Sequence, residues 1–159
     1  MDQKLFLPVF PISGGCQCGA LSYQLGATPI VLYFCHCSEC QKQSASAFGQ
    51  SMRIYQKDLT ISGDLASFTR HGALQNDLVC EFCPRCGTRL FHRRANYADT
   101  LNIKAGTLDD TSWLKPAGHI WTNSKQGWFE IAPGELSYRE QPKNYDKLIK
   151  RWQQMLGGG

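Results

Sequence analysis

Hydrophobic and polar residues alternate along most of this chain with the period of a half-buried β-strand. Leu21, Tyr23 and Leu25 are apolar and are separated by polar residues, and residues two apart in a strand point to the same face. Ser62, Gly63 and Asp64 form a predicted turn. The same pattern predicts further strands within residues 30–34, 48–54, 59–61, 66–69, 88–92 and 101–105. We therefore expect a mainly β fold.

Two segments have helical features instead. Ser38 is a suitable N-cap for a short helix that would run through Ala45. Near the C-terminus, Asn144 is a second candidate cap. The residues after it place an apolar stripe at helical spacing, formed by Tyr145, Leu148, Ile149 and Trp152. We interpret this stripe as core packing, so the predicted fold is a β domain with a C-terminal helix.

Size and composition narrow the class of protein. The chain has 159 residues, of which 42% are hydrophobic and 19% charged, as in ordinary single-domain globular proteins. The net charge of +4 comes without a block of basic residues, so no nucleic-acid partner is expected. The apolar segment 5–12 is short and is broken by Pro8 and Pro11. We therefore expect neither a signal peptide nor a membrane span, and a cytoplasmic location.

The 8 cysteines occur in short clusters. In a reducing compartment such clusters bind soft metal ions, whereas a secreted disulfide scaffold is the alternative. Cys83-Pro84-Arg85-Cys86-Gly87 has the form of a zinc knuckle, which supplies two of four ligands. Cys16 and Cys18 are two residues apart, so both sulfurs can approach one ion. Together these four cysteines predict a closed structural zinc site.

Three further cysteines, Cys35, Cys37 and Cys40, predict a second zinc site. Three thiolates leave the fourth position of a tetrahedral ion open, as in a catalytic zinc. The alternative is a closed site completed by Cys80 or His36. His36 lies between two proposed ligands, so we expect its side chain to point away from the metal and act around it. Cys80 is otherwise unassigned, although it could form an alternative knuckle with Cys83.

The clusters together resemble a known family. Three segments, Gly14–Ala20, Cys35–Cys40 and Phe82–Thr88, are similar to the signature of the glutathione-dependent formaldehyde-activating enzymes, to which centromere protein V is related. Ala105–Asp110 resembles a family turn. The C-terminal pattern is matched by Pro116, His119, Ile120, Trp121 and Trp128. Gln41-Lys42 and Ala45 depart from the common pattern directly after the second cluster.

The resemblance implies a β-tent fold related to zinc ribbons, with the two zinc sites divided as above. We expect an extension over residues 1–13, the two-zinc domain over 14–135, and a C-terminal strand and helix over 136–159 that pack on the same domain. The chain would then be a carbon–sulfur lyase, which adds glutathione or another thiol to formaldehyde or a related aldehyde.

Candidate residues for this reaction come from several segments. Basic residues could hold anionic glutathione, with Lys42 and Arg89 as the first choices and Arg70, Arg93 and Arg94 as others. His36 and His119 are candidate catalytic residues, since histidine moves protons near neutral pH. Two alternatives remain: a thiol-independent zinc hydrolase, and a zinc-stabilised binding module without catalysis.

Overall fold

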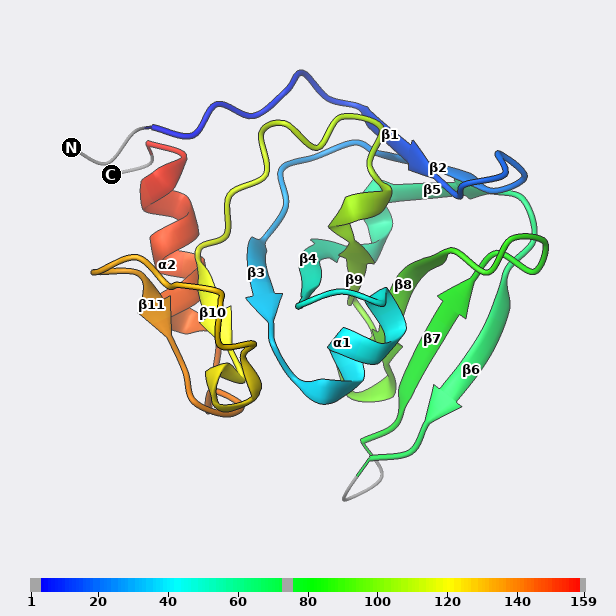
Figure 1. The fold of residues 1–159 in the computed structure, drawn as a ribbon. Coiled ribbons are helices and arrows are strands. Elements are labelled where there is room, and N and C mark those ends of the chain that lie inside the picture. Colours follow the sequence, from blue (N-terminus) through cyan, green and yellow to red (C-terminus); the bar gives the residue numbers. More distant parts are fainter. Residues whose placement is uncertain (1–3, 73–75, 158–159) are drawn as a thin grey trace.

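Two β-sheets and two α-helices make up the fold. A computed structural model describes residues 4–72 and 76–157. The smaller sheet has the strand order β1-β2-β5 and lies at the top of Figure 1. All of its strands are antiparallel, and they span Ile12–Gly15 (β1), Ser22–Leu25 (β2) and Leu59–Ser62 (β5).

The larger sheet has the order β11-β10-β3-β4-β9-β8-β7-β6. It is antiparallel except where β10 lies parallel to both β3 and β11. Its strands are, in chain order, Val31–Cys35 (β3), Gly49–Tyr55 (β4), Ala66–Arg70 (β6), Leu78–Phe82 (β7), Arg89–Arg94 (β8), Thr100–Lys104 (β9), Gly118–Ile120 (β10) and Leu136–Ser137 (β11). Short 3-10 turns connect several of these strands, at Gln56–Asp58, Ala95–Tyr97, Ala105–Thr107 and Thr122–Ser124.

The two helices have different surroundings. Helix α1 (Ser38–Ser44) follows β3 directly, whereas α2 (Asp146–Met155) packs beside β3 at the other side of the molecule (Figure 1). Leu148 and Trp152 of α2 are buried, and the Trp152 indole donates to Pro29 O at 2.9 Å. The Leu5 amide donates to Met155 O at 2.8 Å. The N-terminal segment and the C-terminal helix thus belong to one packed unit.

The mainly β fold with a C-terminal helix is confirmed, with differences in detail. The N-cap of α1 is Cys37, whose sulfur accepts from the Cys40 amide, and not Ser38. Asn144 precedes α2 by two residues and its side chain accepts from the Asp146 amide at 3.1 Å. The strands β1, β7, β10 and β11 have no counterpart in the expected strand set. No helix within 4–72 and 76–157 has the length and hydrophobicity needed to cross a membrane.

Two cysteine groups and a cationic cavity

Four cysteines from two segments far apart in the sequence converge after the end of β1. The sulfurs of Cys16, Cys18, Cys83 and Cys86 all lie within 4.8 Å of one another. Cys16 and Cys18 follow β1, and their sulfurs are 3.6 Å apart. The Cys18 and Cys83 sulfurs are 3.8 Å apart although 65 positions separate them in the chain. Four soft donors in this arrangement match a closed tetrahedral metal site, with no position for an added ligand.

The turn between Cys83 and Cys86 is held by backbone hydrogen bonds. The Cys83 amide donates to Thr88 O at 2.9 Å, and the Gly87 amide donates back to Cys83 O at 2.8 Å. Gly87 has φ +78°, which a side chain would disfavour. The hydroxyl of Thr88 lies 3.2 Å from the Cys86 sulfur, and this hydrogen bond lowers the pKa of Cys86 to about 5. The turn therefore favours a thiolate, the form that binds metal.

The second group has three members, Cys35, Cys37 and Cys40, whose sulfurs also lie within 4.8 Å of one another. Cys35 ends β3, Cys37 caps α1 and Cys40 lies in its first turn. Hydrogen bonds from Cys35 and then Cys40 lower the pKa of Cys37 to about 2, while the same contact raises the pKa of Cys35. These contacts therefore favour the thiolate form of Cys37, the form that binds metal. Three convergent soft donors fit a thiophilic metal ion with one open position.

Neither proposed fourth ligand joins this three-cysteine group. Cys80 belongs to β7, is buried, and its sulfur lies 3.7 Å from Leu78 O. His36 points to His119, whose Nδ1 is 2.9 Å from His36 Nε2. Among the described His, Cys, Asp and Glu residues, the groups suited to hold a metal ion contain neither of them. The geometry therefore favours the open form of the second site over the closed one.

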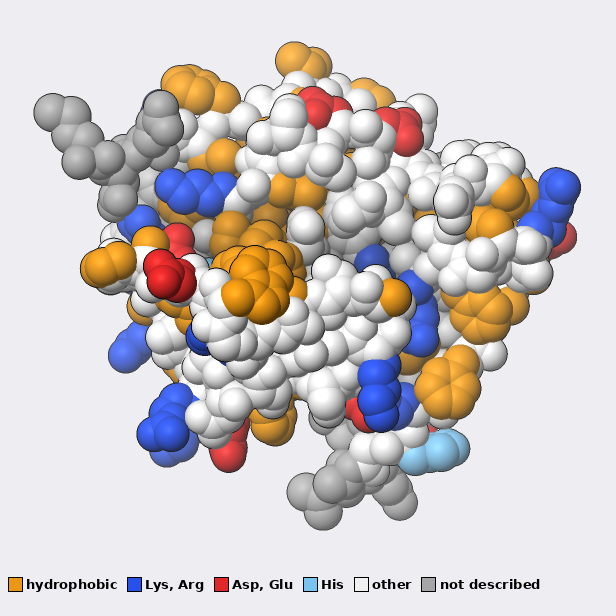
Figure 2. All heavy atoms as spheres, viewed as in Figure 1, with side chains coloured by type: hydrophobic (Ala, Val, Ile, Leu, Met, Phe, Trp, Pro, Cys, Tyr) orange, Lys and Arg blue, Asp and Glu red, His pale blue; other side chains and the backbone are white. Residues whose placement is uncertain are grey.

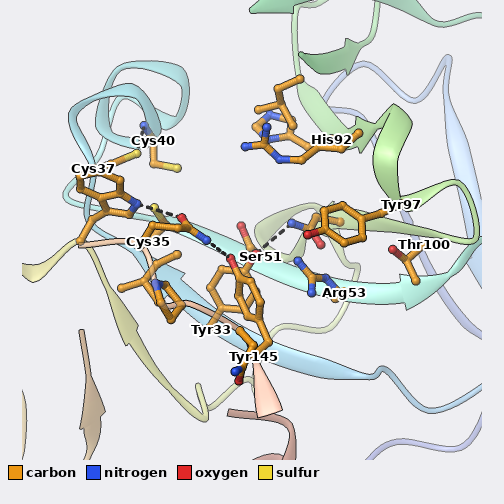
Figure 3. A pocket seen from close by; sticks show the side chains of 18 of the residues that line it. Tyr33, Cys35, Cys37, Cys40, Ser51, Arg53, His92, Tyr97, Thr100 and Tyr145 are labelled. Atoms are coloured by element: carbon orange, nitrogen blue, oxygen red, sulfur yellow. Dashed lines mark hydrogen bonds between the residues drawn. The ribbon is translucent and has the colours of Figure 1, made fainter. Parts of the chain in front are cut away.

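A cavity of about 550 Å³ opens from the three-cysteine group. Figure 3 shows Cys35, Cys37 and Cys40 at one end and Arg53, Tyr97 and Thr100 at the other, with His92 above and Tyr145 below. At the far end the Arg53 guanidinium lies 4.1 Å from the centre of the Tyr145 ring. A flat cation stacked on an aromatic ring keeps its charge available to a ligand in the cavity.

Positive charge dominates the cavity wall. Arg53, Arg70 and Arg94 line it, as does neutral His92, which accepts from an Arg89 guanidinium nitrogen at 3.2 Å. Burial, and then the neighbouring cations, lower the pKa of His92 to about 2. Arg70 lies 3.8 Å from exposed Glu39, an ion pair of small energetic weight. The arrangement suits a ligand that carries carboxylate groups. Basic side chains also gather on the outer surface beside β6 and β7 (Figure 2).

Lys42 and Arg89, the first choices for glutathione binding, do not line this cavity. Lys42 lies in the last turn of α1, and Arg89 stands behind His92. Arg93 is engaged elsewhere, since its Nε donates to both carboxylate oxygens of Glu81 at 2.9 and 3.0 Å. Of the five basic residues proposed from sequence, Arg70 and Arg94 reach the cavity. Sequence reasoning missed Arg53, because only the pairing of β4 with its neighbours brings it there.

The two candidate catalytic histidines form a buried chain away from the cavity. His119 Nε2 is 3.1 Å from a Glu135 oxygen. Because the carboxylate accepts there, His119 Nδ1 in turn accepts the Nε2 proton of His36. His36 Nδ1 is then an acceptor, and it is buried without a hydrogen-bond partner among the residues that the structure describes. Phe48 and Phe129 pack against His36. Both rings therefore lie outside the three-cysteine group, although His36 stands between two of its members in the sequence.

The C-terminal part of the chain closes the cavity. Trp121 has φ 59°, an unusual conformation for a bulky residue and one often found at binding sites. Its indole donates to the Gln141 side chain at 3.1 Å, and Gln141 donates to Tyr145 Oη at 2.7 Å. Tyr145 and Ile149 of α2 also line the cavity. One edge of the stripe that was predicted to pack in the core therefore lines the cavity.

The fold and the two cysteine groups define a mainly β protein with one four-sulfur and one three-sulfur group, each of which could hold a metal ion. The chain belongs to the glutathione-dependent formaldehyde-activating enzyme family, whose sequence profile matches residues 11–124. A crystal structure of a Rhodobacter sphaeroides protein shares the fold, with a TM-score of 0.51 and 17% identity over 80% of this chain and 99% of the other. No curated protein matches the chain.

Proposed function

We propose that the chain is a zinc-dependent carbon–sulfur lyase-type enzyme that adds glutathione or another thiol to formaldehyde or a related small aldehyde. The observation that carries this is the three-cysteine group at the end of a cationic cavity. Family membership supports glutathione and formaldehyde as the substrate pair. Zinc held by Cys35, Cys37 and Cys40 would supply an open position at which a thiol is favoured as thiolate. The other four cysteines would hold a second, structural zinc.

The protein's own residues bind and orient the substrates. Arg70 and Arg94 receive carboxylates of the thiol, and the Arg53–Tyr145 pair holds its far end. The thiol sulfur attacks the aldehyde carbon, a carbon–sulfur bond forms, and the carbonyl π bond breaks. The sulfur's proton is delivered to the former carbonyl oxygen, which gives S-hydroxymethylglutathione. The reverse step is the lyase reaction. Reduced cysteines suit a cytoplasmic enzyme.

Carbon-13 NMR exchange spectroscopy tests the proposal. Formaldehyde and glutathione also form the adduct without an enzyme, so the test compares the exchange rate with and without the protein. With labelled formaldehyde and glutathione, the zinc-loaded protein should accelerate exchange between free aldehyde and adduct. Cys37→Ser should abolish that acceleration, whereas Cys80→Ser should retain it, since Cys80 lies outside both metal groups. Equal exchange rates with and without the protein would contradict the proposal.

Two controls separate the alternatives. Turnover of a small ester or imine without any thiol would indicate a hydrolase. For a binding module, a cobalt-loaded protein should keep an unchanged visible spectrum when thiol is added, because its sites would all be closed.

A further inference from the structure

Lys104, at the end of β9, is a buried lysine that donates to a hydroxyl group. It is 6% exposed. Its ammonium group donates to the Ser51 hydroxyl, on the neighbouring strand β4, at 3.3 Å. Among residues 4–72 and 76–157, no Asp or Glu lies within ion-pair distance of it. A buried charge with only a hydroxyl partner is unfavourable, so a further negative group is expected nearby.

The three-cysteine group supplies that negative charge. A side chain at Gly49 would meet Lys104 Nζ at 3.1 Å and Cys40 Cβ at 3.2 Å. The ammonium and Cys40 Cβ therefore both border the space that glycine leaves open at this position, which Gln43 Nε2 also borders at 3.1 Å. Burial lowers the pKa of Lys104, and the three sulfurs oppose this shift. The other cationic groups on this side, Arg70, Arg89 and Arg94, surround His92 and add to the field.

Charge balance suggests what the ammonium is for. Three thiolates and a dication leave one net negative charge, which Lys104 cancels. A thiolate in the fourth position would bring a second negative charge into a poorly solvated site. Without Lys104 that ligand would be opposed by the sulfurs already present, whereas a neutral ligand would not.

We propose that Lys104 is a positioning residue whose ammonium charge makes the three-cysteine metal site selective for an anionic fourth ligand over a neutral one. This inference rests on the proposed function, because it requires a metal ion on Cys35, Cys37 and Cys40. It adds to that function the charge of the species that the open position accepts, and it assigns the selectivity to a residue outside the ligand set.

The test compares ligand binding to cobalt-loaded wild type, Lys104→Met and Lys104→Arg. The probes are 2-mercaptoethanol, which binds as thiolate, and imidazole, which binds neutral; visible absorption reports the fourth position. Lys104→Met should weaken 2-mercaptoethanol binding by about 10- to 100-fold, the range that Coulomb's law gives for one unit charge about 6–12 Å away at an effective dielectric constant of about 20. Imidazole affinity should change by less than about threefold, and Lys104→Arg should retain most of the thiolate affinity.

Ser51→Ala is the matched control, because it removes the hydrogen bond and leaves the charge. It should change thiolate affinity by less than about threefold. Equal weakening of both probes in Lys104→Met, or unchanged binding of both, would overturn the proposal. Loss of cobalt from both Lys104 variants would also overturn it, since Lys104 would then be a ligand. If the spectrum of the cobalt-loaded wild type does not change when thiol is added, the proposed function itself is wrong. That result differs from every outcome that contradicts only the role of Lys104.

Discussion

If one cysteine group is structural and the other reactive, removing one cysteine from each should reduce the stability of the protein by different amounts. Cys83→Ser breaks a link between segments 65 positions apart, as measured from Cys18. If a metal bridge restricts the unfolded chain as a disulfide does, closing a loop of this length stabilises the folded state by about 4 kcal/mol. Cys37→Ser breaks a link within a loop of a few residues, for which the same relation gives about 2 kcal/mol.

Thermal unfolding followed by circular dichroism, with zinc counted per chain by mass spectrometry, measures the difference. For a chain of this size, 1 kcal/mol corresponds to about 2–4 °C in Tm. Cys83→Ser should therefore melt about 8–16 °C below wild type and Cys37→Ser about 4–8 °C below, each with one zinc fewer. Cys80→Ser controls for the loss of a buried thiol and should keep both ions. Equal melting of the first two variants would refute the assignment of structural and reactive sites.

Three further outcomes are expected. Arg94→Gln should raise KM for glutathione about tenfold and leave KM for a neutral thiol unchanged, since one charged hydrogen bond is lost. Steady-state kinetics measure both values. An equal change in KM for the two thiols would show that Arg94 does not bind a carboxylate. Gly49→Ala should weaken metal binding at the three-cysteine group, measured by chelator competition, because the methyl group meets both Lys104 and Cys40. The pKa of buried His92 falls from 6.5 to about 2 on folding, so its contribution to stability is complete above pH 6.5 and decreases at lower pH. Relative to His92→Gln, wild type should lose about 1.4 kcal/mol per pH unit below 6.5 in denaturant titrations, and a constant difference would contradict the shift.

The cysteine groups could be predicted from the sequence because metal ligation is locally encoded. Cys35, Cys37 and Cys40 lie within one strand end and one helical turn, so their spacing nearly fixes their geometry. The knuckle at Cys83–Cys86 is similarly local. A closed zinc site takes four ligands, and this requirement was enough to pair the knuckle with Cys16 and Cys18.

The cavity could not be predicted because its walls come from distant elements. Arg53, Tyr97 and Tyr145 belong to three separate segments that only tertiary pairing brings together. In α2, helical spacing marks an apolar face, but it does not reveal that Leu148 enters the core while Ile149 borders a cavity. Strand β7 was not predicted because three consecutive apolar residues, Leu78, Val79 and Cys80, interrupt the alternation that marks a half-buried strand; Cys80 packs there as an ordinary buried residue.

One wall of the cavity lies beyond the part of the chain that the family profile matches. The profile ends at residue 124, whereas Gln141, Tyr145 and Ile149 follow it. Both cysteine groups precede that limit, so the residues suited to hold metal and this wall of the cavity lie in different parts of the chain. We therefore expect that exchanging the residues after 124 for those of a relative would change substrate preference and leave the metal content unchanged.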